Sequence, residues 1–212
     1  MVERAVADAE TRTSAELVVV VTTRSGRYDR AEDLFGLVLA LAAVTAAWAV
    51  WQDLAPDTRD WTGGQTLTFG LVPLLGLFVA WAFVGATLAT RFPILARPFI
   101  PRSQFDAEVR RGGFEAFHLF RVGRTAGRTG ILIYISLLER TALVVGDDTI
   151  NATLAPSTWD AACRTIVRGI RAGKPEQGLA EAVVLCGRAL AESFPVRPGD
   201  TDVLPNTVHL VD

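Results

Sequence analysis

Histidine and cysteine are scarce in this sequence, which holds only two of each among its 212 residues. Cys163 and Cys186 are too few and too far apart for a zinc knuckle, and neither has a histidine nearby in sequence. We therefore expect both cysteines to be reduced residues of the protein core. The formal net charge is −2, so the chain as a whole lacks the basic excess typical of a nucleic-acid-binding protein.

The common phosphate-transfer motifs are also missing from the sequence. It contains no C-x5-R loop, no D-x-D-x-T signature and no glycine-rich cradle followed by lysine. The nearest candidate, residues 123–130, is a basic glycine-containing loop that precedes an expected strand rather than a helix. No catalytic residue is assigned, and we expect a protein that is not an enzyme; if it is one, a phosphatase is the alternative.

Charge is absent from two long apolar runs, Leu34–Trp51 and Thr66–Thr90. A helix needs about 20 apolar residues to cross the hydrocarbon core of a bilayer, so both runs predict transmembrane helices. Ionisable groups, which transport pathways require, occur in neither run. The two runs therefore predict a two-span anchor in the lipid bilayer, rather than a transporter.

The flanking arginines predict the orientation of this anchor. Four arginines between residues 12 and 30 precede the first run, and five between residues 91 and 111 follow the second, whereas the loop between the runs holds only Arg59. Arginine and lysine remain on the cytoplasmic side when loops are short. The sequence thus predicts a multi-pass protein of the bacterial inner membrane with both termini in the cytoplasm. The first residues lack the basic-then-apolar layout of a cleavable signal peptide, which fits a first segment that stays in the cytoplasm.

The remaining residues predict one α/β domain that the membrane hairpin interrupts. Apolar β-branched runs at Glu16–Thr23 and Ile131–Leu137 predict strands covered on both faces, and Thr141–Gly146 should pair with the second of them as a hairpin. Helical spacing predicts helices at Val2–Glu10, from an N-cap at Ser103 to Arg121, around Trp159–Ile170 and around Leu179–Leu190. The domain would comprise residues 1–33 and 91–195, the membrane hairpin residues 34–90, and a flexible tail residues 196–212.

Several short motifs in these segments resemble the TPM-domain family. Thr13–Val20 resembles its first strand, and Thr129–Ile133, Glu139-Arg140 and Gly146-Asp147 resemble its central hairpin. Phe194-Pro195 and Leu204-Pro205-Asn206 are similar to a bacterial branch of YgcG-like predicted membrane proteins. The resemblance implies an α/β/α sandwich. It also implies calcium binding and weak acid phosphatase activity, or assembly and maintenance of membrane complexes. The family's usual leading signal peptide and extracytoplasmic domain differ from the layout here.

One acidic cluster is a candidate metal site, formed by Asp147, Asp148 and Glu16. The first two follow the third expected strand and Glu16 begins the first, and carboxylates at strand ends suit calcium or another divalent cation. Alternatively, Asp147 and Asp148 form a turn that caps the segment beginning at Thr149. Glu139 should lie at the opposite end of the hairpin, where Glu139-Arg140 would form a solvated turn. The sequence thus predicts a membrane-anchored module that binds another membrane protein, tuned by a divalent cation.

Overall fold

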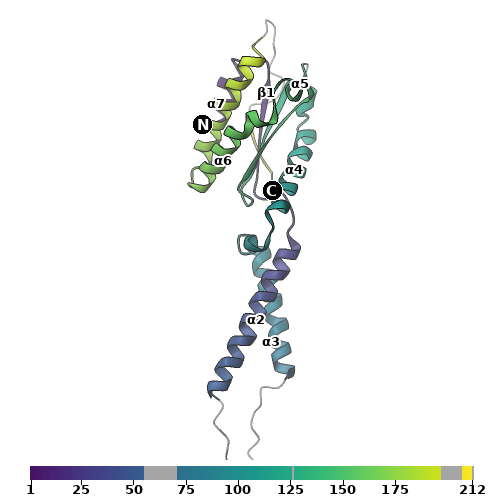
Figure 1. Cartoon of the computed structure of the whole chain (residues 1–212), viewed down its shortest axis with the longest axis vertical. Helices are drawn as coiled ribbons and strands as arrows, with labels where there is room; N and C mark the ends of the chain where they lie inside the picture. The colour runs from purple at the N-terminus through teal and green to yellow at the C-terminus, as the bar shows by residue number, and fades with distance from the viewer. Residues whose placement is uncertain (55–70, 126, 197–206, 212) are drawn as a thin grey trace, which may run out of the picture. The chain divides into compact units, whose positions relative to one another are not determined.

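The structure is a computed structural model that describes residues 1–54, 71–125, 127–196 and 207–211. The chain divides into two compact units (Figure 1). Unit 1 contains Met1–Arg27 and Arg102–Asp212, and unit 2 contains Tyr28–Pro101. Unit 2 therefore begins a few residues before the first apolar run, Leu34–Trp51. The reason is that residues 29–33 belong to the same helix as that run.

Unit 1 is built on a mixed four-stranded sheet in the order β3-β2-β1-β4. Strand β1 (Glu16–Thr22) lies parallel to both β2 (Gly130–Ser136) and β4 (Val208–Val211). Strand β3 (Thr141–Gly146) pairs antiparallel with β2, which confirms the expected hairpin. Every residue of β2 is buried and β1 is nearly so, as their unbroken apolar runs indicate.

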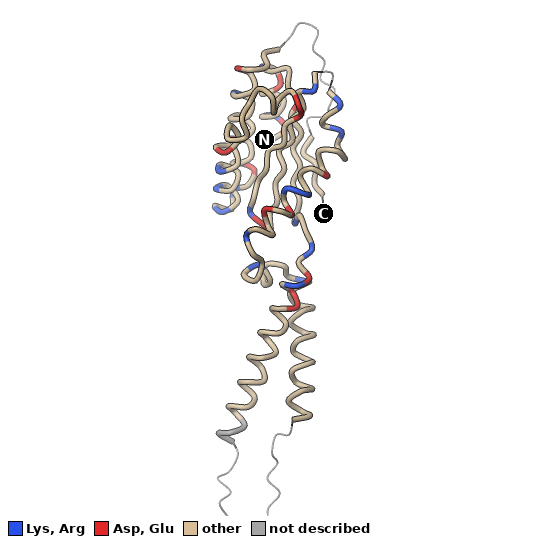
Figure 2. The backbone as a smooth tube through the Cα atoms, turned by 45° about the vertical axis from the view of Figure 1, so that its right-hand side comes forward, with Lys and Arg blue, Asp and Glu red and all other residues tan. Residues whose placement is uncertain are grey.

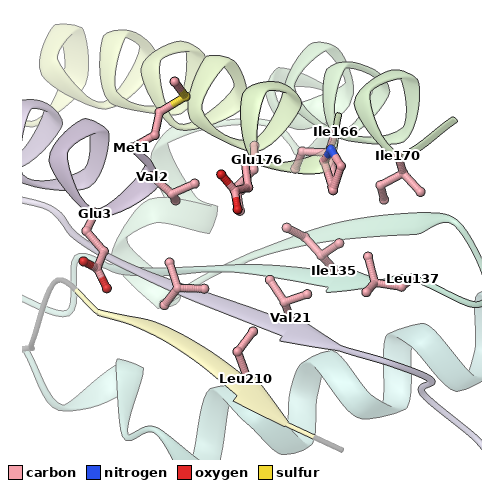
Figure 3. Close-up of a pocket in the computed structure, with 13 residues that line it drawn as sticks. Met1, Val2, Glu3, Val21, Ile135, Leu137, Ile166, Ile170, Glu176 and Leu210 are labelled. Carbon is pink, nitrogen blue, oxygen red and sulfur yellow. The ribbon is translucent and has the colours of Figure 1, made fainter. Parts of the chain in front are cut away.

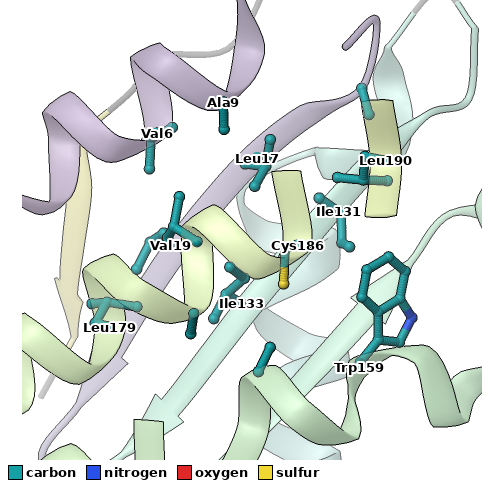
Figure 4. Packing of buried hydrophobic residues seen from close by; sticks show 14 of the residues in the cluster. Val6, Ala9, Leu17, Val19, Ile131, Ile133, Trp159, Leu179, Cys186 and Leu190 are labelled. Atoms are coloured by element: carbon teal, nitrogen blue, oxygen red, sulfur yellow. The ribbon is translucent and has the colours of Figure 1, made fainter. Parts of the chain in front are cut away.

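Helices cover both faces of this sheet. Helices α1 (Val2–Glu10), α6 (Asp160–Arg171) and α7 (Pro175–Ser193) pack on one face, where Leu17, Ile133 and Leu190 lie in the main hydrophobic cluster (Figure 4). Helix α4 (Arg102–Leu119) covers the other face, where Val109 packs with Val20 and Tyr134 of the sheet. The alternation of side chains along each strand divides its apolar residues between these two clusters.

Shorter helices connect these elements. They are η2 (Val122–Arg124), α5 (Asp148–Thr153) and η3 (Pro156–Trp159). The indole of Trp159 is buried in the cluster beneath α6 and α7.

Unit 2 consists of two long helices, α2 (Asp29–Leu54) and α3 (Leu71–Arg91), followed by the short helix η1 (Arg97–Phe99). The helices approach closely at Gly36 and Gly85, where a Cβ added to Gly85 would lie 2.6 Å from the Gly36 Cα. Small residues at a crossing allow two backbones to pack against each other. At the same end of the pair, the Thr90 hydroxyl donates a 2.6 Å hydrogen bond to the Glu32 carboxylate.

Two expectations about segment ends need correction. Residues 208–211, assigned from sequence to a flexible tail, form β4, because its backbone pairs with the edge of β1. Ser103 is not an N-cap: α4 begins one residue earlier, at Arg102 after Pro101, so Ser103 lies within the first turn. Residues 197–206 of the expected tail, 66–70 of the second apolar run and most of the loop around Trp61 lie outside the described residues.

Candidate functional site

Two of the three residues of the expected metal site lie at the same end of the sheet. Glu16 begins β1 opposite Gly130 of β2, and the Asp147 backbone N–H donates a 2.9 Å hydrogen bond to the Gly130 carbonyl. This end carries the amino termini of the parallel strands β1 and β2. Ligands in α/β sheets gather at the carboxyl ends, so the general rule does not select this end as a binding site.

Asp147 is the N-cap of helix α5. Its Oδ1 accepts a 2.8 Å hydrogen bond from the backbone N–H of Asp148, which satisfies one of the free donors at the helix start. Its Oδ2 is buried and has no hydrogen-bond partner among the described residues. The capping alternative thus accounts for one carboxylate oxygen and leaves the other available.

Asp148 and Glu16 have different surroundings. The side chain of Asp148 is 80% exposed and forms a 2.9 Å ion pair with Arg128 from the loop before β2. Glu16 is buried at the start of β1, where its backbone N–H donates to the Thr129 carbonyl at 3.3 Å. Asp148 therefore already has a cationic partner, which opposes the binding of a second cation at the same carboxylate.

This arrangement fits a single carboxylate ligand better than a cage of carboxylates. Within the residues that the structure describes, no three His, Cys, Asp or Glu side chains come together as a metal-binding group. A hard cation such as calcium takes six to eight oxygen ligands, and Asp147 Oδ2 would supply one of them. The other ligands would be backbone carbonyls and waters.

At the opposite end of the sheet, Glu139 is buried rather than solvated, which corrects the expected surface turn. Its side chain is 3% exposed, and its Oε1 accepts a 2.9 Å hydrogen bond from the Ser25 backbone N–H. The Ser136 hydroxyl donates to its other oxygen. Arg140 takes the left-handed conformation, with φ at 51°, as the turn between β2 and β3 reverses the chain. The carboxylate thereby links the segment after β1 to the hairpin.

A second feature of unit 1 is an apolar groove between α1, the α6–α7 pair and the sheet (Figure 3). The groove has a volume of about 420 Å³, and we call it the α1–β4 groove. Its lining includes Val2, Val21, Ile135, Ile166, Leu179 and Leu210. Leu210 of β4 is 80% exposed, and β4 is the last strand on its side of the sheet. An apolar groove thus adjoins a strand edge that has no partner strand among the described residues.

Comparison with known proteins establishes the fold alone. No family model matches the chain, and no curated protein matches it. A solved structure that resembles it is the NMR structure of the BA42 protein from the psychrophilic bacterium Bizionia argentinensis. The two are 20% identical, the match covers 99% of this chain and 90% of that one, and the TM-score is 0.57. At this identity the likeness supports a shared mixed α/β fold and no shared activity.

Neither the α1–β4 groove nor the buried carboxylate of Glu139 could be predicted from a local sequence pattern. The pattern Ser136-x-x-Glu139 is short, and its meaning depends on Ser25, which lies more than a hundred residues away. The groove requires β4, whose four residues resemble a tail segment until they pair with β1. The burial of Glu139 could have been predicted only from the position of this residue beside β1 and β2, which are both buried.

Proposed function

We propose that this chain is a two-span protein of the bacterial inner membrane that binds another membrane protein through its α/β unit. Its role would be non-enzymatic, in the assembly or maintenance of a membrane complex. The observation that carries the proposal is the α1–β4 groove beside β4, the last strand on that side of the described sheet. The TPM resemblance is consistent with this role.

The occupant we propose is an extended segment of the partner. An exposed strand edge offers unpaired backbone N–H and C=O groups, to which an added strand can hydrogen-bond. Alternate side chains of that strand would point to one face of the sheet, where the α1–β4 groove accepts apolar groups. Met1 and Leu210, which line the groove, are 77% and 80% exposed, so a partner would remove apolar surface from water.

The proposal of a membrane anchor is based on the exposed apolar surfaces of α2 and α3. Their most apolar windows are only 11% and 6% buried within the structure, whereas a core helix of a soluble protein is mostly buried. Between their polar ends, neither helix carries Lys, Arg, Asp or Glu in its described apolar stretch (Figure 2). An apolar surface of this extent is favourable in lipid and unfavourable in water.

The partner proposal is tested by site-specific crosslinking in membranes. A photo-crosslinking residue placed at Leu210 should capture one membrane protein in a stoichiometric adduct, and Leu210→Asp should abolish its co-purification from solubilised membranes. The matched control is Leu185, an apolar residue of α7 that is 37% exposed outside the groove. If Leu185→Asp reduces co-purification as much as Leu210→Asp, or if the Leu210 adduct is absent, the groove is not the binding surface.

The orientation has its own test, because it rests on the arginine asymmetry alone. A cysteine placed between residues 57 and 64 should react with an impermeant thiol reagent in intact cells. A cysteine at Thr207 should react only after the membrane is opened. The reverse pattern would place the α/β unit outside the cytoplasm.

A divalent cation is a second element of the proposal, and the free Oδ2 of Asp147 supports it. If calcium binds there, excess calcium should raise the melting temperature of the solubilised protein, because a ligand of the folded state stabilises it by mass action. Asp147→Asn should remove that increase while keeping the helix cap, since asparagine caps as well as aspartate. Asp148→Asn is the control, as that carboxylate pairs with Arg128. An unchanged melting curve in calcium would leave Asp147 with capping alone.

A further inference from the structure

Residues 92–100, which follow helix α3, expose large apolar side chains on unit 2, and we call them the η1 segment. Phe92, Ile94 and Leu95 are 55%, 61% and 37% exposed. They come directly after Arg91, the last residue of α3. Exposure of neighbouring large apolar groups is unfavourable in water, so a surface that covers them would lower the free energy of this segment.

The η1 segment folds back onto the start of α2. The short helix η1 contacts α2 (Figure 1), and the ring of Phe99 meets that of Phe35 edge to face with the ring centroids 6.3 Å apart. Ala96 and Ile100 are 1% and 6% exposed. The segment therefore has an anchored side, and its three exposed apolar side chains are presented by a folded structure.

The ends of the uncharged stretches show where the surface of a bilayer would cross unit 2. On α2 the exposed Asp33 is the last charged residue before the apolar run, and on α3 the uncharged stretch ends at Arg91. The hydrogen bond from Thr90 to Glu32 places these two ends side by side. Charged side chains remain outside the hydrocarbon core. Because η1 contacts α2 at Phe35, two residues beyond Asp33, the η1 segment stays at this level of the bilayer.

The backbone of the η1 segment suits a region that contains little water. Four backbone N–H groups donate hydrogen bonds of 2.9–3.2 Å to carbonyls within the segment, those of Leu95, Ala96, Phe99 and Ile100. Pro93 and Pro98 have no N–H group to satisfy. An unsatisfied backbone group is costly in an apolar environment, so these turns lower the cost of placing the segment at the edge of the hydrocarbon.

We propose that the η1 segment is a lipid-binding surface that inserts Phe92, Ile94 and Leu95 at the boundary between the headgroups and acyl chains of the bilayer. The guanidinium of the exposed Arg91 remains among the headgroups while its aliphatic stem lies along the apolar side chains. Insertion holds the end of α3 at a fixed depth. This inference rests on the membrane anchor proposed above, and it adds a lipid contact that does not span the bilayer.

The contact is apolar rather than electrostatic. Acidic and basic side chains occur together at this end of unit 2, namely Asp29, Arg30, Asp33 and Arg91. Their charges offset one another, so an anionic lipid is not required. The η1 segment should therefore insert into bilayers of uncharged phosphatidylcholine, and salt should leave the insertion unchanged.

The experiment measures the depth of a fluorescent amino acid placed at position 94 of the full chain in phosphatidylcholine vesicles. Lipids that carry bromine at successive positions of the acyl chain quench the probe according to its depth. Bromine nearest the headgroups should quench position 94 most, which places it within about 10 Å of the headgroup boundary. Position 41, about 10 Å further along α2 than Leu34, should be quenched most by deeper bromine. Position 185, on the exposed side of α7, should not be quenched.

A matched pair of variants tests whether the apolar side chains cause the insertion. With the probe at position 92, Ile94→Asp should reduce quenching because it places a charge at the acyl boundary, whereas Ile94→Leu should preserve it. Circular dichroism checks that each variant is folded. Equal quenching in the two variants would contradict the inference.

The depth measurements separate this inference from the membrane anchor. If position 41 is quenched and position 94 is not, the inference is overturned and the anchor stands. If neither is quenched, the anchor is wrong and the inference falls with it. The inference is also overturned if position 94 is as deep as position 41, if position 185 is quenched as strongly as position 94, or if high salt abolishes the quenching at position 94.

Discussion

Unit 1 buries its apolar side chains in its interior, whereas unit 2 exposes many of its own on its surface. In unit 1, Leu17, Ile133 and Leu190 are at most 1% exposed, enclosed between the sheet and its helices. In unit 2, Leu37, Leu41 and Phe83 are 50%, 62% and 70% exposed, while the buried positions of α3 are Gly85 and Ala89. The first unit encloses its apolar side chains, as a domain folded in water does, whereas the second exposes them and pairs its helices through small residues, a pattern compatible with membrane spans.

The largest difference between the units should follow from removing one large aliphatic side chain from each. Ile133→Ala leaves a cavity in a closed core and should lower the free energy of unfolding of unit 1 by about 2–5 kcal/mol. Leu41→Ala removes a side chain from an outer surface and should change the stability of unit 2 by less than about 1 kcal/mol. Hydrogen exchange with mass spectrometry, which reports on peptides of each unit separately, measures both. Equal losses would mean that α2 is a core helix.

A charge on the outer face of α2 sharpens the same comparison. Leu41→Asp should disfavour membrane insertion by about 2.5–3.5 kcal/mol if this face contacts lipid. Leu185→Asp, on the water-exposed side of α7, should leave insertion unchanged. The fraction of protein that resists alkaline extraction from membranes measures the effect. Full retention of the Leu41→Asp protein would contradict a lipid-facing position.

The close contact in unit 2 provides a smaller effect with an internal control. Gly85→Ala would bring a methyl group against the Gly36 backbone and should destabilise the helix pair by about 1–3 kcal/mol. Gly76→Ala, on the same helix, meets open space and should be neutral or slightly stabilising. The yield of a disulfide engineered between α2 and α3 compares the two variants. Lower yield for Gly76→Ala than for Gly85→Ala would show that the crossing is misplaced.

The free energy of unfolding of unit 1 should also depend on pH through a thiol buried in its core. Burial raises the pKa of the Cys186 thiol to about 12. Because the folded-state pKa lies above the unfolded value, the thiol's contribution to stability is complete below about pH 9 and is lost as the pH rises toward 12. At pH 10 the loss should be about 1 kcal/mol relative to pH 8. Cys186→Val, measured by urea unfolding at both values, should remove that part of the pH dependence; an identical dependence would mean that the thiolate forms without unfolding.

Local patterns account for most of the elements seen. The uncharged runs predicted α2 and α3, and the β-branched runs predicted β1 and β2, because lipid exposure and burial on both faces each select for unbroken apolar sequence. The hairpin of β2 and β3 was also predictable, since its strands are neighbours in sequence. The candidate metal site was predicted only as a group of residues: Asp147 and Glu16 do share one end of the sheet, while Asp148 turns to Arg128.

The sequence by itself determined where apolar surface must be hidden from water, and so the two units and their main elements. Only the tertiary structure decided that β4 joins β1, that Glu139 is buried and that Ser25 and Tyr134 meet. These outcomes depend on residues far apart in the chain, and short polar segments carry no periodicity that records a distant partner. A strand of four residues gains its hydrogen bonds only from an edge already in place. A carboxylate is buried only where the fold supplies donors for it.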